Sequence, residues 1–184
     1  MPLAFRPEHE ARLERLRDRL GALDGKCVVE PGCGAGVLTV RLAEWVGADG
    51  HVWAFDSSEG MLSHARRFTE EFPQVLVEQA DAETVEMEEG SWDLILCFRF
   101  YPHLKNPRPF LQKCRRALAT DGQLVIANLE GSARLNEIHG RHAVMQGDIM
   151  PDAETLKRQL EADRWMVMEA IDEEDEFFLR AVLL

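Results

Sequence analysis

The sequence lacks the features that mark membrane, secreted and nucleic-acid-binding proteins. It has no apolar run of membrane-spanning length, and its first residues, Met-Pro-Leu-Ala-Phe-Arg-Pro-Glu, contain no apolar segment of the kind found in signal peptides. Basic residues are few, with 21 lysines and arginines against 33 acidic residues, and the formal net charge is -12. An acidic surface repels phosphate backbones, which argues against nucleic acid as a partner. We therefore expect a cytoplasmic protein that contacts neither nucleic acid nor a membrane.

Cysteine is also scarce. The four cysteines are Cys27, Cys33, Cys97 and Cys114, and no two of them form a Cys-x-x-Cys pair. This spacing excludes the usual disulfide frameworks and cysteine zinc sites, and three of the four lie in or beside apolar runs. We expect them to be reduced residues of the protein core.

The composition is that of a globular protein, with 46% hydrophobic and 29% charged residues. No internal repeat or linker divides the 184 residues, so we expect a single domain over residues 1–184. Apolar residues at helical spacing predict an N-terminal helix within residues 1–22, over Pro7–Leu20.

Helical and strand patterns alternate along most of the remaining chain. Short apolar runs predict strands at residues 27–30, 51–56, 75–78, 92–98 and 123–128. Helices are predicted at residues 37–46, 58–72, 107–118 and 152–162. Two final strands, at 165–171 and 177–183, are separated only by an acidic turn, which allows a hairpin. The pattern predicts a Rossmann-like, doubly wound α/β fold whose seventh strand is antiparallel.

The most informative stretch follows the first predicted strand. It reads Glu30-Pro31-Gly32-Cys33-Gly34-Ala35-Gly36, with a glycine at every second position before a helix begins. Glycines alternate in this way where a turn is tight and a ligand lies against bare backbone. The first N–H groups of the helix would then face that ligand. The stretch predicts a site for a nucleotide-like cofactor.

Two details of this stretch limit the identity of the cofactor. The dinucleotide fingerprint G-x-G-x-x-G requires a third glycine at position 37, where this chain has Val37, and the third glycine here is Gly36. Glu30 directly precedes the loop, where its charge would repel a pyrophosphate but attract an ammonium group. No Gly-Lys-Ser/Thr follows, so a phosphate-binding P-loop is excluded. These residues disfavour a nicotinamide-dependent oxidoreductase.

With these motifs, nearly the whole chain resembles the class I S-adenosylmethionine-dependent methyltransferases, in particular the small-molecule branch that includes the ubiquinone/menaquinone-biosynthesis type. The resemblance implies S-adenosylmethionine as the cofactor, with Asp56 binding the ribose hydroxyls, Met61 near the adenine, and Asp81 and Ala82 clamping the adenine. The cofactor-binding residues expected on this basis are Glu30, Gly32, Cys33, Gly34, Gly36, Asp56, Ser57, Met61, Asp81, Ala82 and Phe98.

The methyl acceptor is expected at the carboxyl ends of the fourth and fifth strands. Cys97-Phe98-Arg99-Phe100 stands where amino-methylating nucleic-acid enzymes carry an Asn/Asp-Pro-Pro-aromatic tetrad, which favours a small-molecule acceptor. Residues 129–151 are the expected substrate lid. Arg99 could bind the methionine carboxylate or an anionic substrate, or form a structural salt bridge.

The candidates for a general base are His103, Tyr101, His139 and His142. His139 and His142 are three residues apart and, with Glu137 or Asp148, could also ligate a metal or simply lie on a polar lid helix. We expect no metal.

The sequence therefore predicts a methyltransferase that transfers a methyl group in line to an oxygen, nitrogen or carbon of a small molecule, acting as a monomer or homodimer. The alternative is a non-catalytic sensor or assembly subunit that binds S-adenosylmethionine, because no catalytic base is obvious and little chain is available to cap the acceptor.

Overall fold

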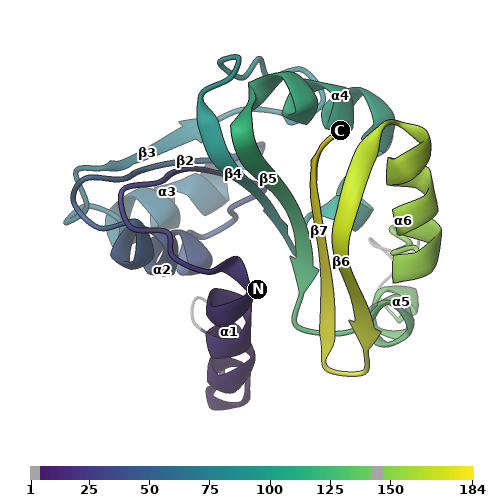
Figure 1. The fold of residues 1–184 in the computed structure, drawn as a ribbon. Helices are drawn as coiled ribbons and strands as arrows, with labels where there is room; N and C mark the ends of the chain where they lie inside the picture. The colour runs from purple at the N-terminus through teal and green to yellow at the C-terminus, as the bar shows by residue number, and fades with distance from the viewer. Residues whose placement is uncertain (1–4, 142–146) are drawn as a thin grey trace.

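The computed structural model describes residues 5–141 and 147–184 of the chain. They form one seven-stranded sheet with helices packed on both faces (Figure 1). The strands are β1 (Cys27–Pro31), β2 (His51–Asp56), β3 (Val75–Gln79), β4 (Trp92–Phe98), β5 (Leu118–Asn128), β6 (Trp165–Glu173) and β7 (Glu176–Leu183). The helices are α1 (Pro7–Leu20), α2 (Val37–Val46), α3 (Glu59–Phe68), α4 (Pro107–Ala117), α5 (Ser132–Gly140) and α6 (Ala153–Ala162).

The order of the strands is β3-β2-β1-β4-β5-β7-β6. The pairs β1–β2, β2–β3, β1–β4 and β4–β5 are parallel, whereas β7 is antiparallel to both of its neighbours, β5 and β6. The predicted doubly wound fold with an antiparallel last strand is thus confirmed. Strands β2 and β3 are added on one side of β1, whereas β4 and β5 are added on its other side. The carboxyl ends of β1, β2 and β4 therefore meet at one edge of the sheet, at this switch point.

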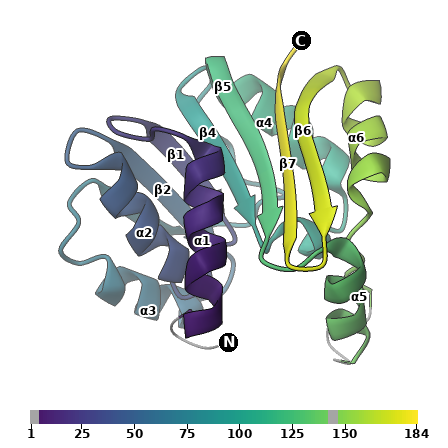
Figure 2. The same cartoon turned by 60° about the horizontal axis from the view of Figure 1, so that its bottom comes forward.

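The two faces of the sheet bury separate clusters of apolar side chains, as strand alternation requires. On β4, Leu94 and Leu96 pack with α1 and α2, whereas Ile95 and Cys97 pack with α4 and α6. Figure 2 shows α1, α2 and α3 together on one face, with α4 and α6 behind the other end of the sheet. This arrangement confirms the predicted helix and strand types and buries three of the four cysteines.

Two predicted boundaries are wrong, one because of a local side-chain bond at a helix end and one because of a shift in strand register. The helix predicted to reach residue 72 ends at Phe68, since Thr69 closes it with a side-chain bond from Oγ1 to the Ala65 carbonyl of 2.9 Å. Strand β5 begins at Leu118 and not after Gly122, because the register against β4 shifts between Trp92 and Leu94. Gly122 lies within this irregularity, where a Cβ atom would come within 2.7 Å of the Trp92 carbonyl oxygen.

Helix α1 is fixed to the β6–β7 hairpin by charged side chains. Arg15 binds Asp175 at 2.7 Å, and Arg19 binds Glu169 at 2.5 Å and Glu176 at 2.6 Å. The pairs fix the second half of α1 to this hairpin. Within residues 5–141 and 147–184, no helix has the length and apolar character needed to cross a membrane.

Candidate functional site

The glycine loop between β1 and α2 is shaped by backbone bonds to the neighbouring strand. The N–H groups of Gly32 and Cys33 both donate to the Phe55 carbonyl, at 2.8 and 3.1 Å. Gly34 and Gly36 have φ angles of 55° and 79°, in the left-handed region that favours glycine. The loop therefore turns sharply at the end of β1 and leads directly into α2.

Asp56, the last residue of β2, connects this loop to α3. Its Oδ2 accepts from the Gly34 N–H at 3.0 Å, and its Oδ1 accepts from the Ser58 N–H at 2.8 Å. Each carboxylate oxygen keeps a further lone pair that a ligand hydroxyl can use. Asp56 is thus oriented by two backbone donors before any ligand arrives.

Glu30 is the buried acidic group of the site. Its side chain is enclosed at the end of β1, with the residue 3% exposed, and Thr39 of α2 donates its hydroxyl to Oε2 at 2.6 Å. Burial raises the pKa of Glu30 to about 8, and the nearby Asp56 charge adds to the rise while the Thr39 bond opposes it. The ligand-free protein therefore holds a proton on Glu30 at neutral pH.

A cleft of about 550 Å³ opens beside these residues. It brings together nearly all of the predicted cofactor residues, at the carboxyl ends of β1, β2, β3 and β4. Those that line it are Glu30, Gly32, Cys33, Gly34, Asp56, Ser57, Met61, Asp81, Ala82 and Phe98. His103, from the list of candidate bases, lines the same cleft.

Gly36 has a different place from the other loop glycines. It lies below the cleft, where a Cβ atom would be 2.7 Å from the Ala65 Cα and 2.8 Å from the Ala65 Cβ. Gly34, in contrast, lines the cleft, and a Cβ atom there would meet nothing within 4 Å. Gly36 thus allows α2 and α3 to pack closely, whereas Gly34 leaves open space for a ligand.

Phe5 and His9, which line the cleft, were not predicted, whereas Phe100 lies in the segment after β4 that was expected to line it. Phe5 and His9 reach the cleft from α1 and the segment before it, and Phe5 packs edge-on against Phe98 with ring centroids 6.2 Å apart. Phe100 lies against the glycine loop, so close that a Cβ atom on Gly32 would fall 2.2 Å from its ring. Periodicity predicted the helix that carries His9 but gave no signal that its first turn faces the site.

The chemistry of the cleft suits S-adenosylmethionine and does not suit a dinucleotide. Four acidic residues, Glu30, Asp56, Asp81 and Glu83, line it, which favours a ligand with an ammonium and a sulfonium and disfavours a diphosphate. Asp81 is already oriented, because its Oδ1 accepts from the Glu83 N–H at 2.9 Å. The open space at Gly34 provides the bare backbone against which such a ligand can lie.

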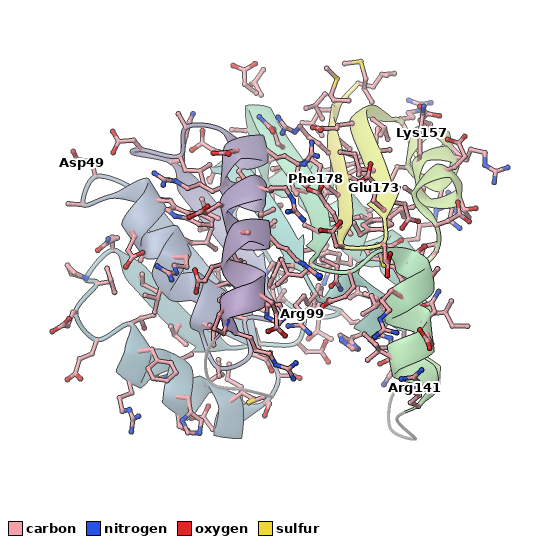
Figure 3. All side chains as sticks on the ribbon, turned by 90° about the horizontal axis from the view of Figure 1, so that it is seen from below. Asp49, Arg99, Arg141, Lys157, Glu173 and Phe178 are labelled. Carbon is pink, nitrogen blue, oxygen red and sulfur yellow. The ribbon has the colours of Figure 1, made fainter. Side chains whose placement is uncertain are left out.

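Arg99 follows β4 and lines the cleft from the opposite wall. Its φ angle of 53° is unusual for a residue with a side chain, and its N–H donates to the Ala127 carbonyl at 2.9 Å. It lies beside the amino-terminal end of α1 (Figure 3). Among the described residues no carboxylate forms a salt bridge with Arg99, so the structural ion pair considered above is not found there.

The three candidate bases that the structure describes are placed very differently. Of these three, only His103 lines the cleft, and its Nδ1 is 2.6 Å from Oδ2 of Asp148. Tyr101 is buried in the apolar cluster and does not line the cleft, and burial raises the pKa of its hydroxyl well above the ordinary value. It therefore remains protonated and is a poor base. His139 is buried on α5, with Nδ1 2.6 Å from the Asp148 carbonyl oxygen, and His142 lies outside the described residues.

The predicted lid, residues 129–151, does not line the cleft within its described part. Within that described part, Asp148 contacts the site by bonding to His103. In the described parts of the chain, no three His, Cys, Asp or Glu side chains form a group that could hold a metal ion. The described residues therefore give no support to His139 as a metal ligand, and its Nδ1 contacts the Asp148 carbonyl oxygen instead.

Comparisons with known proteins agree with this geometry. Residues 28–122 match a family model described as a methyltransferase domain. The chain is 29% identical over 139 residues to the ubiquinone biosynthesis O-methyltransferase of Glaesserella parasuis, covering 71% of this chain and 58% of that protein. It is 38% identical over 109 residues to an uncharacterized 37.1 kDa protein in transposon TN4556 of Streptomyces fradiae, covering 59% of this chain and 32% of that protein.

The chain thus spans between about a third and three fifths of the lengths of these two relatives. Its fold is that of an S-adenosylmethionine-dependent methyltransferase from Aquifex aeolicus, with a TM-score of 0.77 at 20% identity over 98% of this chain and 100% of that one. The family model covers the glycine loop, Asp56, Asp81 and His103, which are the residues that build the cleft. The chain belongs to the class I S-adenosylmethionine-dependent methyltransferases.

Proposed function

We propose that this protein methylates a small molecule, with S-adenosylmethionine bound along the glycine loop and the acceptor bound beside His103. The observation that carries the proposal is one cleft that acidic residues line together with His103, whose ring is bonded to Asp148. Its volume of about 550 Å³ falls within the range of small-molecule sites. The acidic composition of the chain disfavours a nucleic-acid acceptor.

The residues divide the work of cofactor binding. Asp56 accepts from the ribose hydroxyls, Asp81 and Ala82 hold the adenine, and Glu30 faces the ammonium of the methionine portion. When bound, S-adenosylmethionine supplies a methyl group that is open to in-line attack. The apolar side chains Phe5, Phe98 and Phe100 exclude water from the acceptor side of the cleft.

Oxygen is the acceptor atom that His103 favours. A neutral hydroxyl must lose a proton to become a good nucleophile, and a histidine in the cleft can take it. The relative from Glaesserella parasuis is named as an O-methyltransferase. The presence of an oriented His103 removes one reason for considering a non-catalytic sensor, namely the lack of an obvious base.

Calorimetric titration tests the cofactor, and label transfer tests the activity. We expect binding of S-adenosylmethionine and S-adenosylhomocysteine and none of NAD. Protein incubated with methyl-labelled S-adenosylmethionine and a cell extract should transfer label to a small-molecule fraction. Binding without transfer to any fraction would support the sensor instead, and binding of NAD alone would exclude the family cofactor.

Asp56→Ala should weaken S-adenosylhomocysteine binding by about 1–3 kcal/mol, because two ligand hydroxyls lose their acceptor. The substitution also removes the acceptor of the Gly34 and Ser58 N–H groups, so the loop itself is less fixed. Titration calorimetry measures the loss. The matched control is Asp49→Ala in the exposed turn before β2, which should bind as the unaltered protein does. Equal affinities for both variants would place the ribose elsewhere.

Arg99→Gln distinguishes two anions that the arginine could bind. If Arg99 binds the methionine carboxylate, the variant should lose S-adenosylhomocysteine affinity by about 1–3 kcal/mol, while binding of 5'-methylthioadenosine, which lacks the amino acid portion, stays the same. If it binds an anionic acceptor, both affinities should hold and the rate of label transfer should fall. No change in either measurement would show that Arg99 is not part of the site.

A further inference from the structure

We propose that Asp148 is a positioning residue that fixes the tautomer and orientation of His103, and that α5 exists in part to present it. This inference rests on the proposed function, in which His103 acts as the general base. Asp148 is distant in sequence, 45 residues from His103, and lies in the chain that leads from α5 to α6. Sequence reasoning considered it only as a metal ligand.

The backbone around Asp148 is held by two side chains of α5. His139 places its Nδ1 2.6 Å from the Asp148 carbonyl oxygen. Asn136 bonds Met150 twice, donating from Nδ2 to its carbonyl at 2.8 Å and accepting its N–H on Oδ1 at 2.8 Å. The Asp148 carbonyl and the Met150 backbone are therefore both bonded to one helix, and the Asp148 carboxylate contacts His103 in the turn after β4.

Helix α5 is itself attached to the sheet. The N–H and hydroxyl of Ser132, in its first turn, donate to the two carboxylate oxygens of Asp172 on β6, at 2.7 and 2.6 Å. The second Asp172 oxygen also accepts the Ala153 N–H that begins α6, at 3.2 Å. Ser132 at the start of α5 and Ala153 at the start of α6 are thus both bonded to β6, so the helix that contacts Asp148 is itself attached to the sheet.

The contact with Asp148 determines which nitrogen of His103 carries the proton. An ionised carboxylate only accepts hydrogen bonds, so a neutral His103 must carry its hydrogen on Nδ1 when it bonds Asp148. Nε2 then has the free lone pair and is the nitrogen left for a ligand in the cleft. The His139 ring, 5.7 Å from the His103 ring between centroids, restricts rotation of the imidazole.

Charged groups of both signs surround this pair. Lys105 lines the cleft next to His103, and its N–H donates to Oε1 of Glu83 at 3.0 Å; Asp81 and Arg99 line the same cleft. None of the others bonds the His103 ring among the described residues, so Asp148 is the partner that orients it.

The assisted step conserves atoms and charge. The acceptor oxygen forms a bond to the methyl carbon as the carbon–sulfur bond breaks and leaves its electron pair on sulfur. The hydroxyl proton passes to Nε2 of His103 and from there to water. Asp148 contributes by keeping Nε2 unprotonated beforehand and by stabilising the imidazolium afterwards, which is the role of a carboxylate behind a histidine base.

Asp148→Asn is the sharpest test, since it keeps the shape of the side chain but offers an N–H to Nδ1. It should move the proton of neutral His103 from Nδ1 to Nε2, which nitrogen-detected NMR of the imidazole ring reports directly. The initial rate of label transfer should fall by about 100-fold or more. S-adenosylhomocysteine affinity and the melting temperature should stay close to those of the unaltered protein.

Two further variants separate positioning from general stability. Asp148→Glu retains a carboxylate and should keep the Nδ1–H tautomer and recover part of the rate. Glu137→Gln removes an exposed carboxylate of α5 that pairs only with Arg134 and Arg141 among the described residues, and should change neither tautomer nor rate. An unchanged tautomer in Asp148→Asn, or an Nε2–H tautomer in the unaltered protein, would overturn the inference.

The NMR measurement needs no acceptor, so it judges this inference even where transfer is not detected. Absence of cofactor binding and transfer together with the expected tautomers would refute the proposed function and leave the pairing in place. Normal cofactor binding and transfer, with a rate that Asp148→Asn leaves unchanged, would support the proposed function and refute the role of Asp148.

Discussion

Glu30→Gln should make the ligand-free protein more stable at pH 8.5 and at the same time weaken its binding of S-adenosylmethionine. Glu30 is fully enclosed, and burial raises the pKa of its carboxyl from 4.5 to about 8. Between these values the folded protein holds a proton that the unfolded chain has lost, so stability decreases as the pH rises through this window. Above it the folded protein carries a buried charge.

Glutamine cannot ionise and can still accept the Thr39 hydroxyl, so the variant should lack this part of the pH dependence. We expect a gain on the order of 3 kcal/mol at pH 8.5 and little change at pH 5. Thermal or urea unfolding at the two pH values measures it. Glu44→Gln, on the exposed side of the same helix that carries Thr39, is the control and should follow the unaltered protein. A lower stability of Glu30→Gln at pH 8.5 would contradict the prediction.

Binding should change in the opposite direction. The methionine ammonium favours the ionised carboxylate, so the unaltered protein should release a proton on binding and should bind S-adenosylhomocysteine more tightly as pH rises from 6 to 7.5. Glu30→Gln should lose about 1–3 kcal/mol of affinity and most of this pH dependence. Titration in two buffers of different ionisation heat detects the proton. Binding of 5'-methylthioadenosine, which has no ammonium, should differ little between the two proteins.

The second large effect is a contrast between two glycines of one loop. Gly36→Ala should destabilise the fold by about 3 kcal/mol or more, because alanine is strained at a φ of 79° and its Cβ would overlap Ala65. The overlap involves backbone as well as side chain, so relief requires α2 and α3 to move apart. Equilibrium unfolding measures the loss.

Gly34→Ala should cost only about 1–2 kcal/mol of stability, since the φ of 55° is strained but no atom lies within 4 Å of the new Cβ. Its methyl group enters the cleft, so S-adenosylhomocysteine binding should fall more than in Gly36→Ala protein that remains folded. Equal unfolding free energies for the two variants would show that Gly36 is not a packing glycine. Unimpaired binding by Gly34→Ala would mean that the ligand does not lie against this backbone.

The sequence predicted the parallel part of the fold well because local signals and tertiary packing agree there. The run Trp92–Phe98 is apolar on both faces, and the sheet indeed buries both. The end of α3 was missed because apolar spacing does not mark Thr69, which ends the helix with a bond to the Ala65 carbonyl. The start of β5 was missed because Gly122 lies against the Trp92 carbonyl, a contact that only the folded chain makes. The spacing of apolar residues cannot predict that a backbone carbonyl will lie close to a glycine.

The candidate site also contains residues that the sequence predicted and residues that it did not. The glycine loop and Asp56 carry their signal within one strand–loop–helix unit, so spacing alone was informative. Phe5 and Asp148 reach the cleft region from segments that are far from that unit in sequence, and neither has a distinctive neighbourhood. Tyr101 and His103 are two residues apart, yet only His103 reaches the cleft, because the short turn at Tyr101–His103 directs one ring into the core.

The insertion of β7 between β5 and β6 has a consequence for synthesis of the chain. During translation β6 is made before β7, the strand that connects it to the rest of the sheet. Strand β6 therefore stays unpaired until residues 176–183 follow. The outer edge of β5 is exposed for the same interval, and Arg19 lacks its partner Glu176 until then. The order of translation therefore leaves an open sheet edge until β7 has been made, and during this interval pairing with other chains competes with completion of the sheet.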